Sequence, residues 1–204
     1  MCISSISLPN FYRYFLIETE QLTGIKVKSI DDARKACEIL HQMGPSIVFI
    51  TSAILLQEED EDVEDNNNKQ NQQQISQNLT TDTDDDSNKK TITIIASKRC
   101  SDADEGKEEN QTMMWRIDCP LIPGSFTGTG DVTASLLLGH LEHHPNDLPL
   151  VMEKVINTMY VLIRRTHEAK KNTVRSKELR LIQSKDIIEN PPSTFKAAQI
   201  VLGK

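Results

Sequence analysis

The sequence is organised around residues 122–138, which read IPGSFTGTGDVTASLLL. Three glycines and a proline in this stretch come directly before an apolar run. Apolar residues then recur at i, i+3, i+4 and i+7, the spacing of one helix face, at Ala134, Leu137, Leu138 and Leu141. The pattern predicts a helix that begins at the glycines and runs to about His144, before Pro145.

The glycine turn has the composition of an anion site. Gly128 and Gly130 have no Cβ, so the backbone there can adopt positive φ and its N–H groups are not shielded by side chains. The first turn of a helix also has unpaired N–H groups and the positive end of the helix dipole. Together these features suit a phosphate or a developing phosphoryl charge.

Asp131 stands in the first turn of this predicted helix. A carboxylate there repels a phosphate, so it fits a group that accepts a proton from an attacking hydroxyl. The alternative is structural, because an Asp in the first turn is often only a favourable charge on the dipole. The spacing of Gly124, Gly128 and Gly130 does not match the Rossmann G-x-G-x-x-G motif, and no Lys follows the glycines as a P-loop requires.

Residues 128–131 resemble the G-[AT]-G-D signature of the ribokinase-like kinases. Two further segments, 144–148 (HPNDL) and 179–187 (LRLIQSKDI), make the chain similar to the C-terminal half of the pyridoxal kinase family. The resemblance covers most of the chain outside residues 57–90. It implies one partial ribokinase-like kinase domain over residues 1–204, with a mostly parallel sheet flanked by helices.

The resemblance implies ATP-dependent phosphorylation of the 5′-hydroxymethyl group of pyridoxal, pyridoxine and pyridoxamine. The catalytic residues would be Asp131, as general base, with the turn residues Gly128, Thr129 and Gly130. The residues along ATP would be Asn10, Thr51, Ser52, Ile122, Pro123, Gly124, Thr129 and Gly130. The cofactors would be ATP and Mg²⁺, with Glu18 near the metal, and the resemblance also admits a monovalent cation such as K⁺. Family likeness further implies a homodimer in the cytoplasm.

The N-terminal end departs from the family pattern in two ways. The family has a Glu three residues after a Thr-Pro-Asn strand end, whereas Asn10 and Glu18 are eight residues apart and Leu8 replaces the Thr. Residues 11–17 therefore read as inserted sequence, and Glu18 has the alternative of being an ordinary solvated carboxylate. The family also has an N-terminal half, with the pyridoxal pocket and a lid, that nothing in this chain represents.

We therefore expect a truncated product or a partial gene model. Two other functions stay open on the sequence. One is a non-catalytic chain that binds nucleotide or a full-length kinase subunit, and the other is a ribokinase-like kinase for a sugar or nucleoside. The glycine turn fits this last reading, but segments 144–148 and 179–187 are explained less well by it.

Residues 57–90 are a low-complexity segment with 12 Asn or Gln, 11 acidic residues and 3 lysines. Such a segment has too few apolar residues to offset its ordering entropy, so we expect a disordered surface loop. The other 170 residues carry 20 basic against 19 acidic side chains, so the chain offers no basic field for nucleic acid. No apolar run approaches the roughly 20 residues of a membrane span.

The remaining pattern predicts strands that alternate with helices, which indicates the α/β class. Expected strands lie at 3–8, 47–50, 91–96, 112–119 and 178–183. Expected helices follow the capping-box sequence at Ser29, the glycine turn, Asp147 and, for a short helix, Ser184. The run at 47–50 is continuously apolar, as in a strand covered on both faces.

The cysteines and histidines are expected to have structural roles. Cysteines at four positions form no C-x-x-C pair, which fits free thiols in a reducing compartment: Cys2, Cys37, Cys100 and Cys119. Histidines near the end of the glycine-turn helix lack an accompanying carboxylate pattern, so solvated side chains are favoured over a metal site: His140, His143 and His144.

Overall fold

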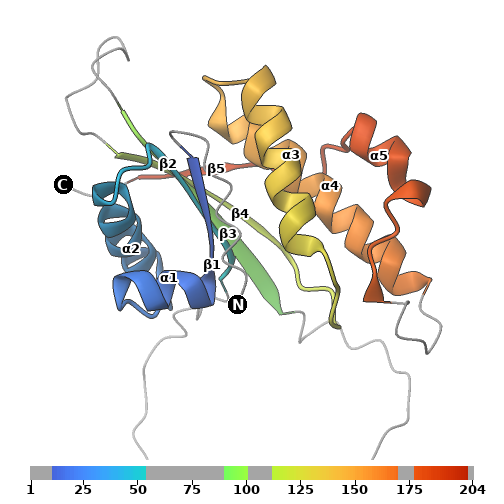
Figure 1. The fold of residues 1–204 in the computed structure, drawn as a ribbon, viewed down its shortest axis with the longest axis horizontal. Helices are drawn as coiled ribbons and strands as arrows, with labels where there is room; N and C mark the ends of the chain where they lie inside the picture. Colours follow the sequence, from blue (N-terminus) through green and yellow to red (C-terminus); the bar gives the residue numbers. More distant parts are fainter. Residues whose placement is uncertain (1–10, 54–89, 101–111, 170–176, 202–204) are drawn as a thin grey trace, which may run out of the picture.

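The computed structural model describes residues 11–53, 90–100, 112–169 and 177–201. These residues form a five-stranded sheet with helices on both faces (Figure 1). The strands are β1 (Phe11–Phe15), β2 (Ile47–Ala53), β3 (Thr91–Arg99), β4 (Thr112–Pro120) and β5 (Ala198–Ile200). The helices are α1 (Leu16–Thr23), α2 (Ile30–Gln42), α3 (Thr129–His143), α4 (Leu148–Glu168) and α5 (Lys185–Glu189).

Each face of the sheet has its own apolar core. On one face, beside α1 and α2, the strand residues that pack with α2 are Val48, Ile50, Ile95 and Met114. On the other face, beneath α3 and α4, the strands contribute Phe49, Ile94, Ala96, Trp115, Ile117 and Cys119. Successive residues of β2 therefore enter opposite cores. This confirms the expectation, drawn from its continuous apolar run, that β2 is covered on both faces.

The sheet order is β1-β2-β3-β4-β5. The pair β1–β2 is parallel, whereas β2–β3, β3–β4 and β4–β5 are antiparallel. The α/β class is confirmed, but the expected mostly parallel arrangement is wrong for the described strands. A parallel crossover needs a dozen or more residues and usually a helix. The connection from β3 to β4 consists only of residues 100–111, whose sequence lacks the apolar pattern of a helix. A connection of this kind suits an antiparallel pair better than a parallel crossover.

The helix boundaries follow the local signals. Ser29 caps α2 through a capping box in which its Oγ accepts from the Asp32 N–H, and Asp32 accepts from the Ser29 N–H. Asp147 caps α4 by accepting from the Leu150 N–H at 3.1 Å. Gly128 precedes α3, which ends at His143 before Pro145. The short helix expected after Ser184 is α5.

One expected strand is wrong, and two elements were not predicted. Residues 178–183 form an isolated bridge at Glu178 and a 3₁₀ turn over Ile182–Ser184, because Ile182 is 88% exposed and has no buried face to pack. Strand β5 is three residues long, and its residues give no alternating pattern. Residues 11–17, which the family pattern indicates as inserted sequence, supply β1 and the start of α1.

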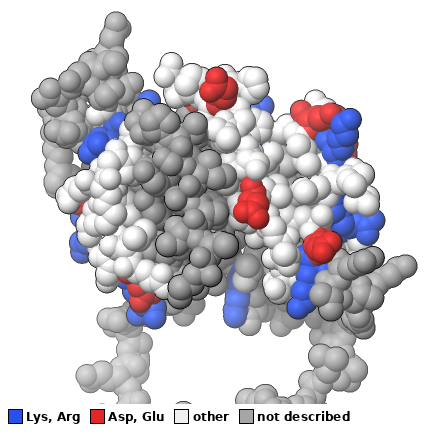
Figure 2. Space-filling view, in the orientation of Figure 1, with Lys and Arg blue, Asp and Glu red and all other residues white. Residues whose placement is uncertain are grey.

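Several predictions lie outside the described residues. These are the strand at 3–8, Asn10, Cys2 and residues 57–89 of the low-complexity segment. Among the described residues, no helix is long and apolar enough to cross a membrane. Acidic and basic side chains are interspersed among the described residues on the face shown in Figure 2, as expected from the near-neutral charge outside residues 57–90.

Candidate functional site

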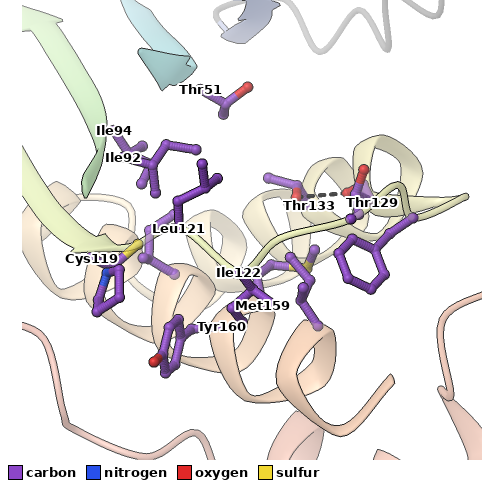
Figure 3. A pocket seen from close by; sticks show the side chains of 15 residues that line it. Thr51, Ile92, Ile94, Cys119, Leu121, Ile122, Thr129, Thr133, Met159 and Tyr160 are labelled. Atoms are coloured by element: carbon purple, nitrogen blue, oxygen red, sulfur yellow. Dashed lines mark hydrogen bonds between the residues drawn. The ribbon is translucent and has the colours of Figure 1, made fainter. Parts of the chain in front are cut away.

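Three strands bring their carboxyl ends to one edge of the sheet. The two antiparallel pairs that flank β3 make β4 run in the same direction as β2, and β1 is parallel to β2. A pocket of about 210 Å³ opens at this edge, between the sheet and helices α3 and α4 (Figure 3). It is lined by Thr51, Ile92, Ile94, Cys119, Pro120, Leu121, Ile122, Gly124, Phe126, Thr129, Thr133, Ile156, Met159, Tyr160 and Ile163.

The glycine turn connects β4 to the first turn of α3 at one side of this pocket. Gly124 and Gly128 have φ of 126° and 89°, values that favour glycine. A Cβ at Gly128 would meet no atom within 4 Å, so the backbone angle, and not lack of space, is what requires glycine there. Gly130 differs from expectation, because it lies inside α3 and has no positive φ.

The turn is anchored by main-chain contacts. The Thr127 N–H donates to the Lys177 carbonyl at 2.8 Å, and Thr127 pairs with Glu178 in a parallel bridge. Within α3, the Thr133 hydroxyl donates to the Thr129 carbonyl at 2.7 Å (Figure 3). Gly128 offers no side-chain cap to the first turn of α3. The positive end of the helix therefore lies at the pocket without a side-chain acceptor from its N-cap.

Asp131 is exposed in the first turn of α3 and is not part of the pocket wall. Its backbone carbonyl accepts from the Ser135 hydroxyl at 2.8 Å. Among the described residues, its carboxylate forms neither an ion pair nor a hydrogen bond. A carboxylate with this freedom, beside a helix N-terminus, is chemically able to take a proton from a bound hydroxyl.

Thr51 brings a polar atom to the pocket from the end of β2. The residue is 8% exposed, and its buried Oγ1 has no hydrogen-bond partner among the described residues. The pairing of β2 with β3 is irregular between Ile50 and Ala53, so the ladder is interrupted where Thr51 and Ser52 lie. Such interruptions re-aim side chains next to functional sites. An unpaired buried hydroxyl is costly, and a bound ligand would satisfy it.

The other predicted site residues are only partly brought together. Ile122, Gly124 and Thr129 line the pocket with Thr51, whereas Pro123 and Gly130 do not. Glu18 lies in α1, three residues after Phe15, which is in register with Thr51. Its backbone is therefore at the same edge of the sheet. Asn10 and the side chains of Glu18 and Ser52 lie outside what the structure describes.

The pocket is mainly apolar and has no charged side chain in its wall. One wall comes from α4, whose contributing residues follow the spacing of a single helix face: Ile156, Met159, Tyr160 and Ile163. The sequence indicated only that α4 had an apolar face, and its side toward the site was not predicted. Burial, and to a smaller extent Asp118, raises the pKa of the Cys119 thiol to about 11, so this group is neutral.

The histidines at the end of α3 are exposed or half-buried, whereas the described cysteines are buried. Among the described residues, no group of three or more His, Cys, Asp or Glu side chains could hold a metal ion. Burial lowers the pKa of His140, with smaller effects from Lys154 and neighbouring histidines. Cys37 is fully buried in the α2 core, where burial raises the pKa of its thiol to about 12.

With helices on both faces of the sheet and a Gly-Thr-Gly-Asp turn at its carboxyl edge, the fold is similar to that of solved kinase structures. A pyridoxal kinase structure from Leishmania donovani, in complex with ADP and pyridoxamine, matches with a TM-score of 0.66 at 21% identity. The match covers 93% of this chain and 51% of that one.

The sequence points to the same proteins, although no family model matches it. The chain is 35% identical over 189 residues to a pyridoxal kinase of Dictyostelium discoideum, with 90% of this chain and 51% of the relative covered. It is 31% identical over 200 residues to a pyridoxal kinase of Arabidopsis thaliana, with 96% and 50% covered. The chain is therefore homologous to pyridoxal kinases, and it spans about half the length of the curated relatives it matches.

Proposed function

We propose that this chain carries the nucleotide-binding and catalytic half of a kinase that transfers the γ-phosphoryl group of ATP to pyridoxal. The acceptor would be the 5′-hydroxymethyl group, and pyridoxine and pyridoxamine would be equivalent substrates. The support comes from the homology over half of the relatives' length and from the site at the carboxyl edge of the sheet.

One observation carries the proposal: the unpartnered Thr51 Oγ1 and the N-terminus of α3 border the same pocket. Because the pocket wall has no Lys or Arg, the phosphates would depend on backbone N–H groups and the helix dipole. Thr129 and Gly124 would provide this phosphate end, with Gly128 and Gly130 shaping the turn. Thr51 would hydrogen-bond the nucleotide, and the apolar wall would enclose its base.

In this proposal Asp131 is the general base. Its carboxylate would accept the proton of the acceptor hydroxyl as that oxygen forms its bond to the γ-phosphorus. The bond from the γ-phosphorus to the leaving oxygen of ADP would break in the same transfer. The first turn of α3 would stabilise negative charge on the phosphoryl oxygens, because its N–H groups and dipole are already oriented.

A magnesium ion would be the metal of this site. Mg²⁺ is usually held by one or two carboxylates together with substrate phosphates, so a three-residue protein cluster is not required. Glu18 is at the same sheet edge as Thr51, through the register of β1 with β2. We propose that Glu18 would hold Mg²⁺ with the phosphates of ATP. The ion would neutralise phosphate charge when bound.

We also propose a cellular compartment and an oligomeric partner for the chain. The three described cysteines are free and buried, as is usual in a reducing compartment. We therefore place the activity in the cytoplasm. A second copy of the chain is the partner that the likeness to pyridoxal kinases implies, as a homodimer.

The proposal is tested in two steps, because the chain matches only half of its relatives. The first is calorimetric titration of the 204-residue chain with ATP in the presence of Mg²⁺. The second is phosphorylation of pyridoxal by a fusion of this chain with the half of the D. discoideum relative that the match leaves uncovered. Binding of ATP and turnover of pyridoxal by the fusion would support the proposal. If neither the 204-residue chain nor the fusion bound ATP, the proposal would be overturned.

The chain covers only about half the length of its relatives, and this also favours a second function. A chain that binds ATP without turnover, as a partner of a complete kinase, would show the first result but not the second. Turnover by the fusion therefore separates an enzyme half from a nucleotide-binding partner.

A further inference from the structure

The C-terminal end of α4 holds the chain segment 177–180 through one buried hydroxyl group. Thr166 lies in the last turn of α4 and is 1% exposed. Its Oγ1 donates to the Leu162 carbonyl at 2.8 Å and accepts from the Arg180 N–H at 3.2 Å. A threonine hydroxyl has one donor and also accepts, so this single atom satisfies both contacts. Segment 177–180 is therefore attached to α4 at Arg180.

The other end of segment 177–180 holds the glycine turn. The Lys177 carbonyl accepts from the Thr127 N–H at 2.8 Å, and Glu178 pairs with Thr127 in a parallel bridge. Thr127 comes directly before Gly128, which is the N-cap of α3. The segment therefore connects the C-terminal end of α4 to the N-terminal end of α3, where the turn borders the pocket.

A ring contact joins the turn to the same end of α4. The rings of Phe126 and His167 are tilted at 59°, with their centroids 6.4 Å apart. Phe126 lines the pocket, and His167 follows Thr166 in α4. Gly128 itself gives the first turn of α3 no side-chain cap. The position of the turn is therefore set by contacts at the C-terminal end of α4, through the ring contact and through segment 177–180.

We propose that Thr166 is a positioning residue for phosphoryl transfer, because it fixes segment 177–180 and thereby the glycine turn at the N-terminus of α3. The inference rests on the proposed function, which places the phosphates at this turn. Glycines give the turn wide backbone freedom, so the turn needs an outside anchor to keep one position. A misplacement of about 1 Å can cost about 10²-fold in rate. Thr166 is not in the pocket wall, so its effect would pass through the backbone of the segment.

The binding test uses two ligands of the 204-residue chain, each of which is a part of ATP. Inorganic tripolyphosphate would contact the turn, whereas adenosine would contact the apolar wall of the pocket. Thr166→Val keeps the branched shape of the side chain and removes its hydroxyl. By calorimetry with Mg²⁺, it should weaken tripolyphosphate binding roughly two- to thirteenfold, as for loss of one hydrogen bond, and leave adenosine binding unchanged. Thr166→Ser restores the hydroxyl and should restore the affinity.

Thr158→Val is the matched control. Thr158 is also a fully buried threonine of α4, and its Oγ1 donates to the Lys154 carbonyl at 2.8 Å. It also contacts the Ile187 carbonyl of α5 at 3.4 Å, so it lies against α5 and not against segment 177–180. Thr158→Val should lower the free energy of unfolding as Thr166→Val does, but should change neither affinity. Hydrogen exchange at the Thr127 amide should become faster in Thr166→Val and stay the same in Thr158→Val.

The effect on the reaction is measured in the fusion with the uncovered half of the D. discoideum relative. Thr166→Val should lower kcat by up to about 10²-fold and leave the KM for pyridoxal unchanged, because a displaced turn misaligns the phosphoryl group and not the acceptor. Thr158→Val should leave both values unchanged. If Thr166→Val does not fold, Arg180→Pro removes the N–H that Thr166 accepts, leaves α4 unaltered and should give the same pattern.

Equal weakening of tripolyphosphate and adenosine in Thr166→Val would show a general loss of structure and overturn the inference. Unchanged tripolyphosphate affinity in that variant would also overturn it, while the proposed function would stand. If Thr158→Val weakened tripolyphosphate binding as much as Thr166→Val, the role would not be specific to segment 177–180. If the unmodified chain bound neither ATP nor tripolyphosphate, the inference and the proposed function would fail together.

Discussion

Thr51→Val separates the stability of the chain from its function at a single atom. The substitution keeps the branched shape of the side chain and removes the buried Oγ1, which has no hydrogen-bond partner among the described residues. A buried polar group without a partner costs about 1–3 kcal/mol. We therefore expect Thr51→Val to raise the free energy of unfolding by roughly 1 kcal/mol, the lower part of that range, since Thr51 borders an open pocket.

The same change should weaken ATP binding. If Oγ1 hydrogen-bonds the nucleotide, its removal costs about 0.5–1.5 kcal/mol of binding free energy, or roughly two- to thirteenfold in Kd. Stability is measured by urea unfolding of the free chain, and affinity by calorimetric titration with ATP and Mg²⁺. The two changes have opposite signs, which a general packing effect would not produce.

Thr93→Val is the matched control. Thr93 is also a buried threonine in the sheet, but its Oγ1 donates to Asp118 Oδ1 at 2.6 Å. Its replacement should lower the free energy of unfolding by about 1–2 kcal/mol. If Thr51→Val destabilised the chain as much as Thr93→Val, Thr51 Oγ1 would have a partner in the free protein. If ATP affinity were unchanged, Thr51 would not belong to the nucleotide site.

Three further predictions concern the base, the α2 core and the packing of α3. In the fusion with the uncovered half of the D. discoideum relative, Asp131→Asn should lower kcat by about 10²–10⁴ and leave ATP affinity intact; full turnover would refute the role of Asp131. Burial lowers the pKa of His41 below its ordinary value of 6.5, so the unfolded chain binds more protons and stability should be lost as the pH falls from 6.5 toward the folded pKa. Urea unfolding between pH 7.5 and 5 checks this, and His41→Ala should flatten the profile. Leu137→Ala should cost about 2–5 kcal/mol, because Leu137 is 1% exposed where α3 enters the core; a loss below 1 kcal/mol would show that the core collapses around the site.

Features decided by neighbours in sequence were predictable. The capping box at Ser29, the Asp147 cap and the start of α3 at Gly128 each depend on residues within one turn of the helix end. The two-faced burial of β2 was predictable for a similar reason, since every residue in its run is apolar. Local chemistry is sufficient in these cases because the determining contacts are made inside the element itself.

Features decided by distant pairing were not predictable. Strand β5 has three residues, and β4 at Met114–Arg116 is what makes it a strand. Residues 11–15 looked inserted when compared with a family pattern, yet their pairing with residues 47–51 makes them the edge strand. The ring of Tyr160 contacts the ring of Phe195, which is 35 residues later in the chain. The sequence around Asn157 gave no signal that its side chain bonds to the backbone of Phe195.

Several predicted site residues lie at one edge of the sheet although the strand directions were predicted wrongly, and the topology explains why. A site at the carboxyl edge requires only that its own strands end there. With β3 antiparallel to both β2 and β4, those two strands still end at the same edge, and β1 joins them through its parallel pairing. Thr51, the glycine turn and Glu18 each follow the end of one of these strands. Because β3 runs in the opposite direction, its start and not its end lies at this edge. The start of β3 therefore contributes Ile92 and Ile94 to the pocket wall.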